Sequence, residues 1–184
     1  MSRLAFWILG ALLLGGIVHL STVLAMPQAA TQDAYSRLAQ LAPVNTVTAL
    51  APPTGQSEIM PFMDPAFAVA VCRYDLSGGA LKFTAPVSQA YTSVTFYTRK
   101  SVAYYAINDR AAGRRTIELD LMTTAQRSEL PEEEDVTTAD RLIIESPSIT
   151  GLIVLRALAP EPGLMAMARR TLAEAKCRRE PSRS

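Results

Sequence analysis

The sequence predicts a mainly β domain, either an antiparallel β-sandwich or a strongly curved sheet, with one amino-terminal transmembrane helix and a carboxyl-terminal helix that packs on the sheet. Short segments of alternating apolar and polar residues are separated by turn residues, which is typical of hairpins. The alternation of strands and helices that marks a parallel α/β sheet does not occur along the chain. The 184 residues also begin with a long apolar run, which is too long to be a strand.

That apolar run covers residues 4–26, LAFWILGALLLGGIVHLSTVLAM, and follows Arg3. At about 1.5 Å per residue, a helix of this length can cross the roughly 30 Å hydrocarbon core of a bilayer. Arg37, the first basic residue after the run, is offset by Asp33. Since basic residues are retained on the cytosolic side, we expect residues 1–3 to be a cytosolic stub and the remaining chain to be exported.

The run has a second interpretation as a cleaved signal peptide. Val23 and Ala25 supply the small residues at −3 and −1 that signal peptidase accepts, so cleavage would follow Ala25. The length of the run and Trp7 near one end favour a retained anchor. Either interpretation exports the body of the protein.

Residues 27–60 are expected to form a short helix and an extended linker. The helix spans 31–41, with Thr31 and Asp33 as cap candidates and with Leu38 and Leu41 at helical spacing. The stretch 43–61 is rich in Pro, Gly, Thr and Ser, which indicates a connector with no core of its own.

The β domain is expected to cover residues 61–184. Ser77-Gly78-Gly79-Ala80 predicts a hairpin turn after the first strand, and Arg99-Lys100 predicts a second one. In the predicted strand 116–121, Glu118 and Asp120 are expected to point outward. Strands are predicted at 66–76, 81–85, 91–98, 102–107, 116–121, 141–145 and 151–158, the last apolar enough to be central.

Two helices are expected within this domain. The first is short, spans 123–130 and precedes the acidic run 132–135, which we interpret as a solvated loop. The second begins at Pro160 and Pro162 and is expected to lie against the sheet. Its predicted apolar face consists of Leu164, Met167, Ala168, Leu172 and Ala175.

The two cysteines, Cys72 and Cys177, both follow the apolar run. In an oxidising compartment such a pair predicts one disulfide that ties the carboxyl terminus to a core strand. The bridge would contribute on the order of 4 kcal/mol. The alternative is a buried thiol in a strand and an unrelated thiol in a frayed tail.

Two segments carry a resemblance to a known family. The runs PFMDPAFAVAVCRYDLSGGALKFTAPV and YTSVTFYTRKSVAYYAINDRAAG resemble the short, membrane-anchored bacterial envelope proteins grouped under the domain of unknown function numbered twelve fifty-four. The resemblance covers residues from about 61 to 158 and the anchor, and rests on the RYDLSGG hairpin and the INDR strand end. It implies a single pass through the bacterial inner membrane with the β domain in the periplasm, and it brings no catalytic residues.

The composition excludes several chemistries. The only histidine, His19, lies in the apolar run, so a monomeric body lacks Ser-His-Asp or Cys-His catalysis and histidine metal sites. Neither a GxGxxG motif nor a Walker loop occurs, and the net charge is +1. We therefore expect no cofactor, no metal and no nucleotide or nucleic-acid partner. The expected partners are the bilayer, through residues 4–26, and another envelope protein.

Candidate site residues lie at strand ends, where sites tend to be built. The cluster of Asn108, Asp109 and Arg110 could hold a polar ligand or carbohydrate, and Asp75 could act as a carboxylate acid or base. Tyr105 belongs to a set of tyrosines that could stack on a sugar or lipid, with Tyr91, Tyr97 and Tyr104. The alternatives are ordinary turn caps for the cluster and cross-strand aromatic pairs for the tyrosines.

Three functions fit these observations. We expect a non-catalytic module that binds or assembles with another envelope protein. The alternatives are a carboxylate-dependent enzyme on envelope glycan, using Asp75 and Asp109, or a module that binds lipid or a small ligand in an apolar cavity between the sheet and the terminal helix. Paired acids in a cleft favour the enzyme, an apolar cavity favours the ligand-binding module, and a flat apolar patch favours a protein partner.

Overall fold

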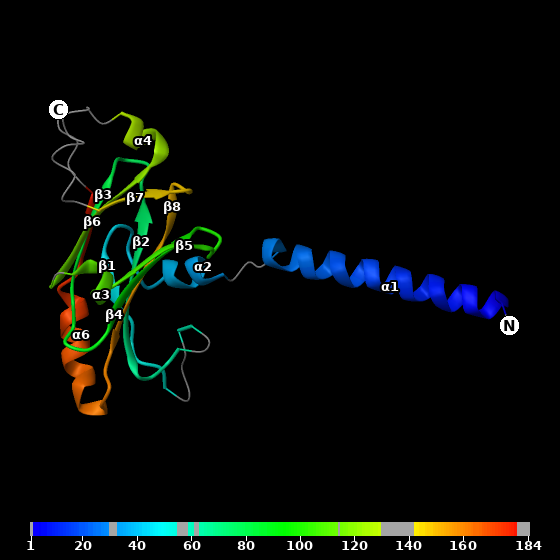
Figure 1. Cartoon of the computed structure of the whole chain (residues 1–184), viewed down its shortest axis with the longest axis horizontal. Coiled ribbons are helices and arrows are strands. Elements are labelled where there is room, and N and C mark those ends of the chain that lie inside the picture. The colour runs from blue at the N-terminus through cyan, green and yellow to red at the C-terminus, as the bar shows by residue number, and fades with distance from the viewer. Residues whose placement is uncertain are drawn as a thin grey trace. The chain divides into compact units, whose positions relative to one another are not determined.

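The computed structural model describes residues 2–29, 33–54, 59–60, 63–113, 115–129 and 142–179 (Figure 1). The chain divides into two units, one that ends at Asp33 and one that begins at Ala34. The predicted acidic loop 132–135 lies outside the described residues, as do the Thr31 cap candidate and Met1 of the predicted stub.

The first unit is the helix α1, Ser2–Ala29. Its apolar span, Arg3–Met26, has a mean hydropathy of 2.1, and its side chains are exposed. The span agrees with the predicted residues 4–26. Within the described ranges, α1 is long and apolar enough to cross a membrane.

The second unit contains two β-sheets, which confirms the predicted fold class. The first sheet is antiparallel throughout and has the strand order β1 (Val47–Ala49), β2 (Phe67–Asp75), β8 (Thr150–Leu158), β4 (Thr92–Thr98) and β5 (Ala103–Asn108). The second sheet has the order β7 (Leu142–Ser146), β6 (Thr116–Thr123), β3 (Leu81–Pro86) and β9 (Lys176–Arg179).

The main core lies between these sheets, because alternate residues of facing strands are buried. Phe83 of β3 meets Phe96 of β4 edge-on, with ring centroids 6.2 Å apart, and neither ring is exposed. The strand β8 is central in its sheet, as predicted, and contributes Ile153 and Leu155 to this core.

Strand pairing departs from the predictions in two places. The turn through Gly79, whose φ is 122°, leads from β2 into the other sheet, where β3 pairs with β6 and β9. The predicted first hairpin is therefore wrong, whereas the second, β4 with β5, is confirmed. The strand β7 runs parallel to β6, which the intervening 18 residues allow because a parallel return needs a crossover of a dozen or more.

One side chain lies on the opposite face from the prediction. Asp120 of β6, expected to point outward, is only 4% exposed. The second half of β6 is buried on both faces, and β6 lies between β3 and β7 within its sheet. Simple alternation of apolar and polar residues describes a half-buried strand, so it does not apply to this part of β6.

The residues that follow the apolar helix are more structured than expected. The helix α2, Ala34–Ala39, is shorter than the predicted 31–41 and buries Leu38, while Leu41 is 49% exposed. The connector contains the edge strand β1 and the buried Leu50. The prediction that it lacks a core is wrong.

The remaining helices support the two sheets. α4, Thr124–Ser128, begins with a capping box in which Thr123 and Gln126 bond each other's backbone N–H groups.

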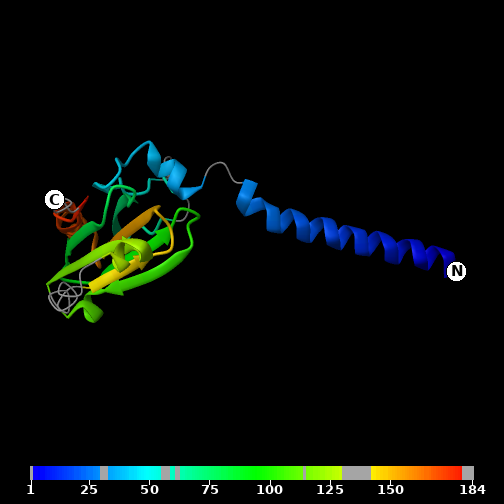
Figure 2. The same ribbon diagram turned by 90° about the horizontal axis from the view of Figure 1, so that it is seen from above.

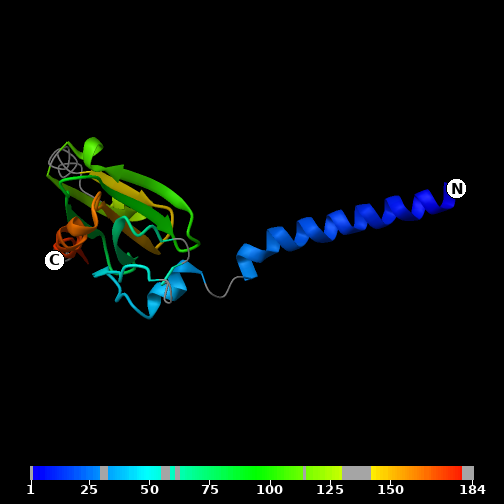
Figure 3. The same cartoon turned by 90° about the horizontal axis from the view of Figure 1, so that it is seen from below.

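α3 spans Asp109–Ala112, and η2, Pro162–Leu164, leads into α6, Met165–Ala173. α6 packs against β2 and β8 through Ala168 and Leu172. α2 and α6 lie on different parts of the domain surface (Figures 2 and 3).

The predicted helix face is only partly correct. Ala168, Leu172 and Ala175 are buried as expected, but Leu164 and Met167 are 37% and 48% exposed. η2 ends at Leu164, so that side chain does not continue the helical spacing of α6.

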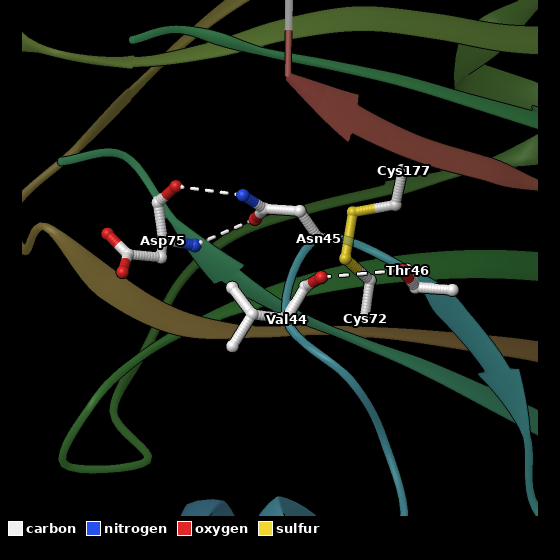
Figure 4. Close-up of a disulfide and its surroundings, with 6 residues drawn as sticks. All are labelled: Val44, Asn45, Thr46, Cys72, Asp75 and Cys177. Atoms are coloured by element: carbon white, nitrogen blue, oxygen red, sulfur yellow. Dashed lines mark hydrogen bonds between the residues drawn. A yellow bond between two sulfur atoms is a disulfide. The ribbon is translucent and has the colours of Figure 1, made fainter. Parts of the chain in front are cut away.

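The disulfide joins the two sheets (Figure 4). Cys72 of β2 and Cys177 of β9 are bonded, with their Cα atoms 6.5 Å apart, and both are buried. The pairing agrees with the prediction. The chain around Cys177 is a strand paired with β3, so the alternative of a frayed tail does not hold for residues 176–179.

Candidate functional site

The first set of predicted site residues caps a short helix. The Asn108 side chain accepts a hydrogen bond from the Ala111 N–H at 2.9 Å, which makes Asn108 the N-cap of α3. Asp109 Oδ1 accepts from the Thr92 N–H at 3.4 Å, and Arg110 is exposed.

Asp75 lies at the other end of the first sheet. Its carboxylate accepts the Ser77 N–H at 2.8 Å, and hydrogen bonds from the Ser77 side chain and backbone hold the pKa of Asp75 below its ordinary value. The Asn45 side chain exchanges two hydrogen bonds with the Asp75 backbone (Figure 4).

Strand register places these two groups far apart. Across the first sheet, Asn108 of β5 pairs with Ser93 of β4. Ser93 pairs with Arg156 of β8, which in turn pairs with Val69 of β2. Asp75 is six residues further along β2, or about 20 Å at 3.3 Å per residue. Asp75 and Asp109 therefore do not form one pair of acids.

The tyrosines pair with other aromatic rings or lie on separate faces. Tyr105 and Tyr104 both contact Phe96, with ring centroids 5.9 and 6.2 Å away, and Tyr91 meets Phe67 at 6.5 Å. These contacts are the cross-strand and neighbouring pairs that stabilise a sheet. The remaining tyrosine, Tyr97, lines the cavity described below.

A buried hydroxyl cluster lies within the sandwich. The Tyr74 hydroxyl is 3.0 Å from Ser146 Oγ, 3.2 Å from the Tyr104 hydroxyl and 3.2 Å from the Tyr97 carbonyl oxygen, to which it donates. Burial raises the pKa of Tyr104 above its ordinary value. Gly151 fits against this cluster because a methyl group there would overlap the Tyr74 hydroxyl and the Tyr97 carbonyl.

A cavity lies on the outer face of the first sheet, beneath α2 and the connector. Its volume is about 380 Å³, within the range of small-molecule sites. A separate apolar cluster, distinct from the main core, surrounds it. The lining comes from α2, the connector and strands β2, β4 and β8: Ala34, Leu38, Leu50, Met60, Met63, Asp64, Phe67, Val69, Val71, Tyr97, Ser101, Leu152, Val154 and Arg156. We call this cavity the α2 pocket.

Strand periodicity explains the floor of the α2 pocket. Val69 and Val71 alternate with the core residues of β2, and Leu152 and Val154 alternate with those of β8. Val71 pairs directly with Val154, so the two strands present one continuous apolar surface. This surface, on the side of the sheet away from the sandwich core, is partly covered by Leu38 of α2.

Two arginines hold α2 over the pocket. Two guanidinium groups lie over the Tyr35 ring, that of Arg73 at 4.7 Å from the ring centroid and that of Arg99 at 4.2 Å. Arg73 Nη1 donates to the carbonyl oxygens of Ala39 and Ala42, both at 3.1 Å, and so bonds backbone groups at the end of the helix. We call Tyr35, Arg73 and Arg99 the α2 clamp.

The polar groups at the pocket are few. Asp64 Oδ1 accepts the Ala66 N–H at 2.9 Å, which uses this carboxylate oxygen in a turn. Arg156 and Ser101 are exposed members of the lining. The arrangement suits an apolar group with a polar end. Among the described residues, His, Cys, Asp and Glu side chains form no group of three that could hold a metal ion.

Sequence reasoning missed this pocket, although one signal pointed to it. β2 is apolar on both faces over AFAVAV, which implies that both sides of the strand are covered. The core of the sandwich accounts for one side, and α2 with the connector accounts for the other. The predicted location, between the sheet and the terminal helix, is not where this pocket lies.

Comparison with known proteins gives a fold relationship. The crystal structure of the VPA0106 protein from Vibrio parahaemolyticus matches with a TM-score of 0.58 and 12% identity, over 79% of this chain and 34% of that chain. An uncharacterized protein from Burkholderia cenocepacia gives a TM-score of 0.49 and 14% identity, over 82% of this chain and 42% of that one. No family model and no curated protein matches the sequence. The chain thus spans about a third of the length of the Vibrio protein and shares its fold over that part.

Proposed function

We propose that this protein is a membrane-anchored binding module that holds one aliphatic chain in the α2 pocket. The observation that carries the proposal is the pocket itself, a cavity of about 380 Å³ whose floor is formed by Val69, Val71, Leu152 and Val154. Small-ligand sites are concave and mostly apolar, with a few polar groups that orient the ligand. The α2 pocket has each of these features.

The size and position of the pocket support a single chain over a protein partner. Its volume is at the small end of the roughly 300–1,000 Å³ typical of ligand sites. The apolar floor is recessed beneath α2, whereas a protein interface needs a broad accessible surface. Binding to another envelope protein, which the sequence favours, stays the second candidate.

We also propose that α1 is a retained anchor in the inner membrane of a bacterium, with its amino terminus in the cytosol and the β domain in the periplasm. Arg3 before the apolar span supports this orientation. The disulfide supports an oxidising compartment, since such bonds persist outside the cytosol. A periplasm-dependent phosphatase fused after Ser184 should be active, and a cytosolic reporter at the same place should be inactive. The reverse result refutes the orientation.

The ligand proposal is tested by photolabelling the full chain in phosphatidylcholine nanodiscs, because detergent would itself compete for the pocket. The probe is a long-chain alcohol with a diazirine in the middle of its chain, and labelled peptides are identified by mass spectrometry. We expect label on β2 and β8 that a non-photoreactive alcohol displaces. Label confined to α1 contradicts the proposal, since that pattern reports only contact with the bilayer.

A pair of variants sharpens the experiment. Val154→Trp places a large ring in the cavity and should abolish labelling of β2 and β8. Ile149→Trp adds the same ring at a side chain that is 56% exposed and does not line the pocket, so labelling should persist. Equal labelling of both variants would show that the probe does not occupy the cavity.

A further inference from the structure

We propose that the α2 pocket selects a single-chain amphiphile with an anionic head, a long-chain carboxylate, and that Arg156 contacts this head. The inference rests on the proposed function and adds the class of ligand. It follows from the charges around the pocket, the position of Arg156 on β8 and the size of the cavity.

The lining of the pocket carries one base, Arg156, and one acid, Asp64. The Asp64 carboxylate accepts the N–H of Ala66 in its own turn. Arg156 is exposed. Further bases, Arg73 and Arg99, contact Tyr35 of α2. An apolar cavity with an available arginine in its lining is complementary to an acyl chain that ends in an anion.

Arg156 lies at the position that the anionic head group of such a ligand would occupy. Leu152, Val154 and Arg156 follow one another at every second position of β8 and line the same cavity. Consecutive side chains on one face are about 6.6 Å apart. A chain laid over Leu152 and Val154 therefore brings its end to the guanidinium.

The Arg156 guanidinium is available to a ligand. Its direct neighbours across the sheet are Val69 on β2 and Ser93 on β4, neither of which carries a charge. Within the part of the chain that the structure describes, the Arg156 side chain forms no ion pair or hydrogen bond, and it is exposed. Arginine can bind a carboxylate through two parallel hydrogen bonds.

The cavity volume distinguishes a free carboxylate from a phospholipid as the source of the anionic head group. A free carboxylate carries one chain, whereas a phospholipid carries two. A cavity of about 380 Å³ is small among ligand sites, which favours the single chain.

The experiment compares three photoreactive probes on the full chain in phosphatidylcholine nanodiscs. They are a long-chain carboxylate, the alcohol of the same length and a phosphatidylglycerol with one diazirine chain, at a pH at which the carboxylate is ionised. Labelling of β2 and β8 is measured against the mole fraction of probe. We expect the carboxylate to half-saturate at about one tenth of the mole fraction that the alcohol needs, the ratio that one charge-assisted contact gives.

Two variants with the same loss of charge complete the test. Arg156→Gln should bring half-saturation by the carboxylate to the mole fraction that the alcohol needs in the same variant, and an unchanged melting temperature shows that the variant is folded. Arg170→Gln changes an exposed arginine of α6 that does not line the pocket, and it should keep the tenfold difference.

The failures of the two proposals are distinct. Equal labelling by carboxylate and alcohol in the wild-type chain overturns the anionic selection and leaves the proposed function standing. A preference for carboxylate that survives Arg156→Gln refutes the role of Arg156. Stronger labelling by phosphatidylglycerol than by the carboxylate overturns the single-chain ligand. Absence of pocket labelling by every probe overturns the proposed function itself.

Discussion

The α2 clamp makes a prediction about Tyr35, whose ring contacts two guanidinium groups. Tyr35→Leu keeps an apolar side chain of similar size but removes the aromatic face that attracts Arg73 and Arg99. Each cation–π contact is worth roughly 0.5–1 kcal/mol when exposed and about 2 kcal/mol when desolvated. For the half-buried Tyr35, the two contacts together should therefore contribute about 1.5 kcal/mol, of which the better helix propensity of leucine offsets a few tenths.

The loss should appear as local opening of α2 with little effect on the sandwich. Leu38 and Ala42 belong to the outer apolar cluster, which is distinct from the main core between the sheets. A loss of about 1.4 kcal/mol raises the population of an open state roughly tenfold. Hydrogen exchange of the full chain in nanodiscs should thus accelerate about tenfold at the Leu41 and Ala42 amides, which are bonded to the Leu38 carbonyl.

Tyr35→Phe is the matched control, because phenylalanine keeps the aromatic ring and therefore its contacts with both guanidinium groups. Its exchange rates should stay close to those of the wild-type chain. If Tyr35→Leu exchanges at the same rate as Tyr35→Phe, the arginine contacts do not hold α2. If hydrogen exchange of the β6 amides accelerates as much as that of the α2 amides, α2 does not open independently of the sandwich, which contradicts the prediction.

Three further predictions concern the sandwich. Reduction of the disulfide, which spans 105 residues, should lower the free energy of unfolding by up to about 4.7 kcal/mol in urea titrations with and without dithiothreitol; coincident curves would contradict this estimate. Gly151→Ala should cost about 2–3 kcal/mol through overlap with Tyr74 and the Tyr97 carbonyl, whereas Gly163→Ala, with open space around it, should cost nothing measurable. The raised pKa of Tyr104 means that the folded state keeps a proton which the unfolded state releases, so stability should fall as the pH rises above about 10. Tyr104→Phe should lessen that fall in melting temperatures measured across this range, and an unchanged pH dependence would argue against it.

Much of the fold could be predicted because it depends on local patterns. Period-two alternation located most strands, including β4, where Val94 and Phe96 are buried. The disulfide was predictable because both cysteines follow a long apolar segment, from which an oxidising compartment is expected. The apolar span of α1 was predictable because an uninterrupted apolar run of this length is typical of a membrane-spanning helix.

Strand pairing was not predictable to the same degree. The glycines after Asp75 indicate a change of direction, which Gly79 makes with a positive φ. They do not indicate which strand lies next to β3, since that choice depends on β6 and β9, which follow much later in the chain. The parallel pairing of β7 is decided in the same way by contacts distant in sequence.

The candidate site was the least predictable part. Its lining combines strand residues with α2 and the connector. The connector resembles a coreless linker in sequence because it is rich in proline and threonine. The contacts of Arg73 and Arg99 with Tyr35 follow only from tertiary packing. The polar residues that attract attention in the sequence, such as Asn108, serve instead as caps.

The bond between Cys72 and Cys177 joins segments that are synthesised far apart. β3 lacks its neighbour on one side until β9 has been made, about a hundred residues after Cys72. Throughout that interval the growing chain carries an open strand edge and a reduced thiol in an incomplete interior. Pairing of β9 and closure of the disulfide therefore come late in assembly, and together they remove the open edge.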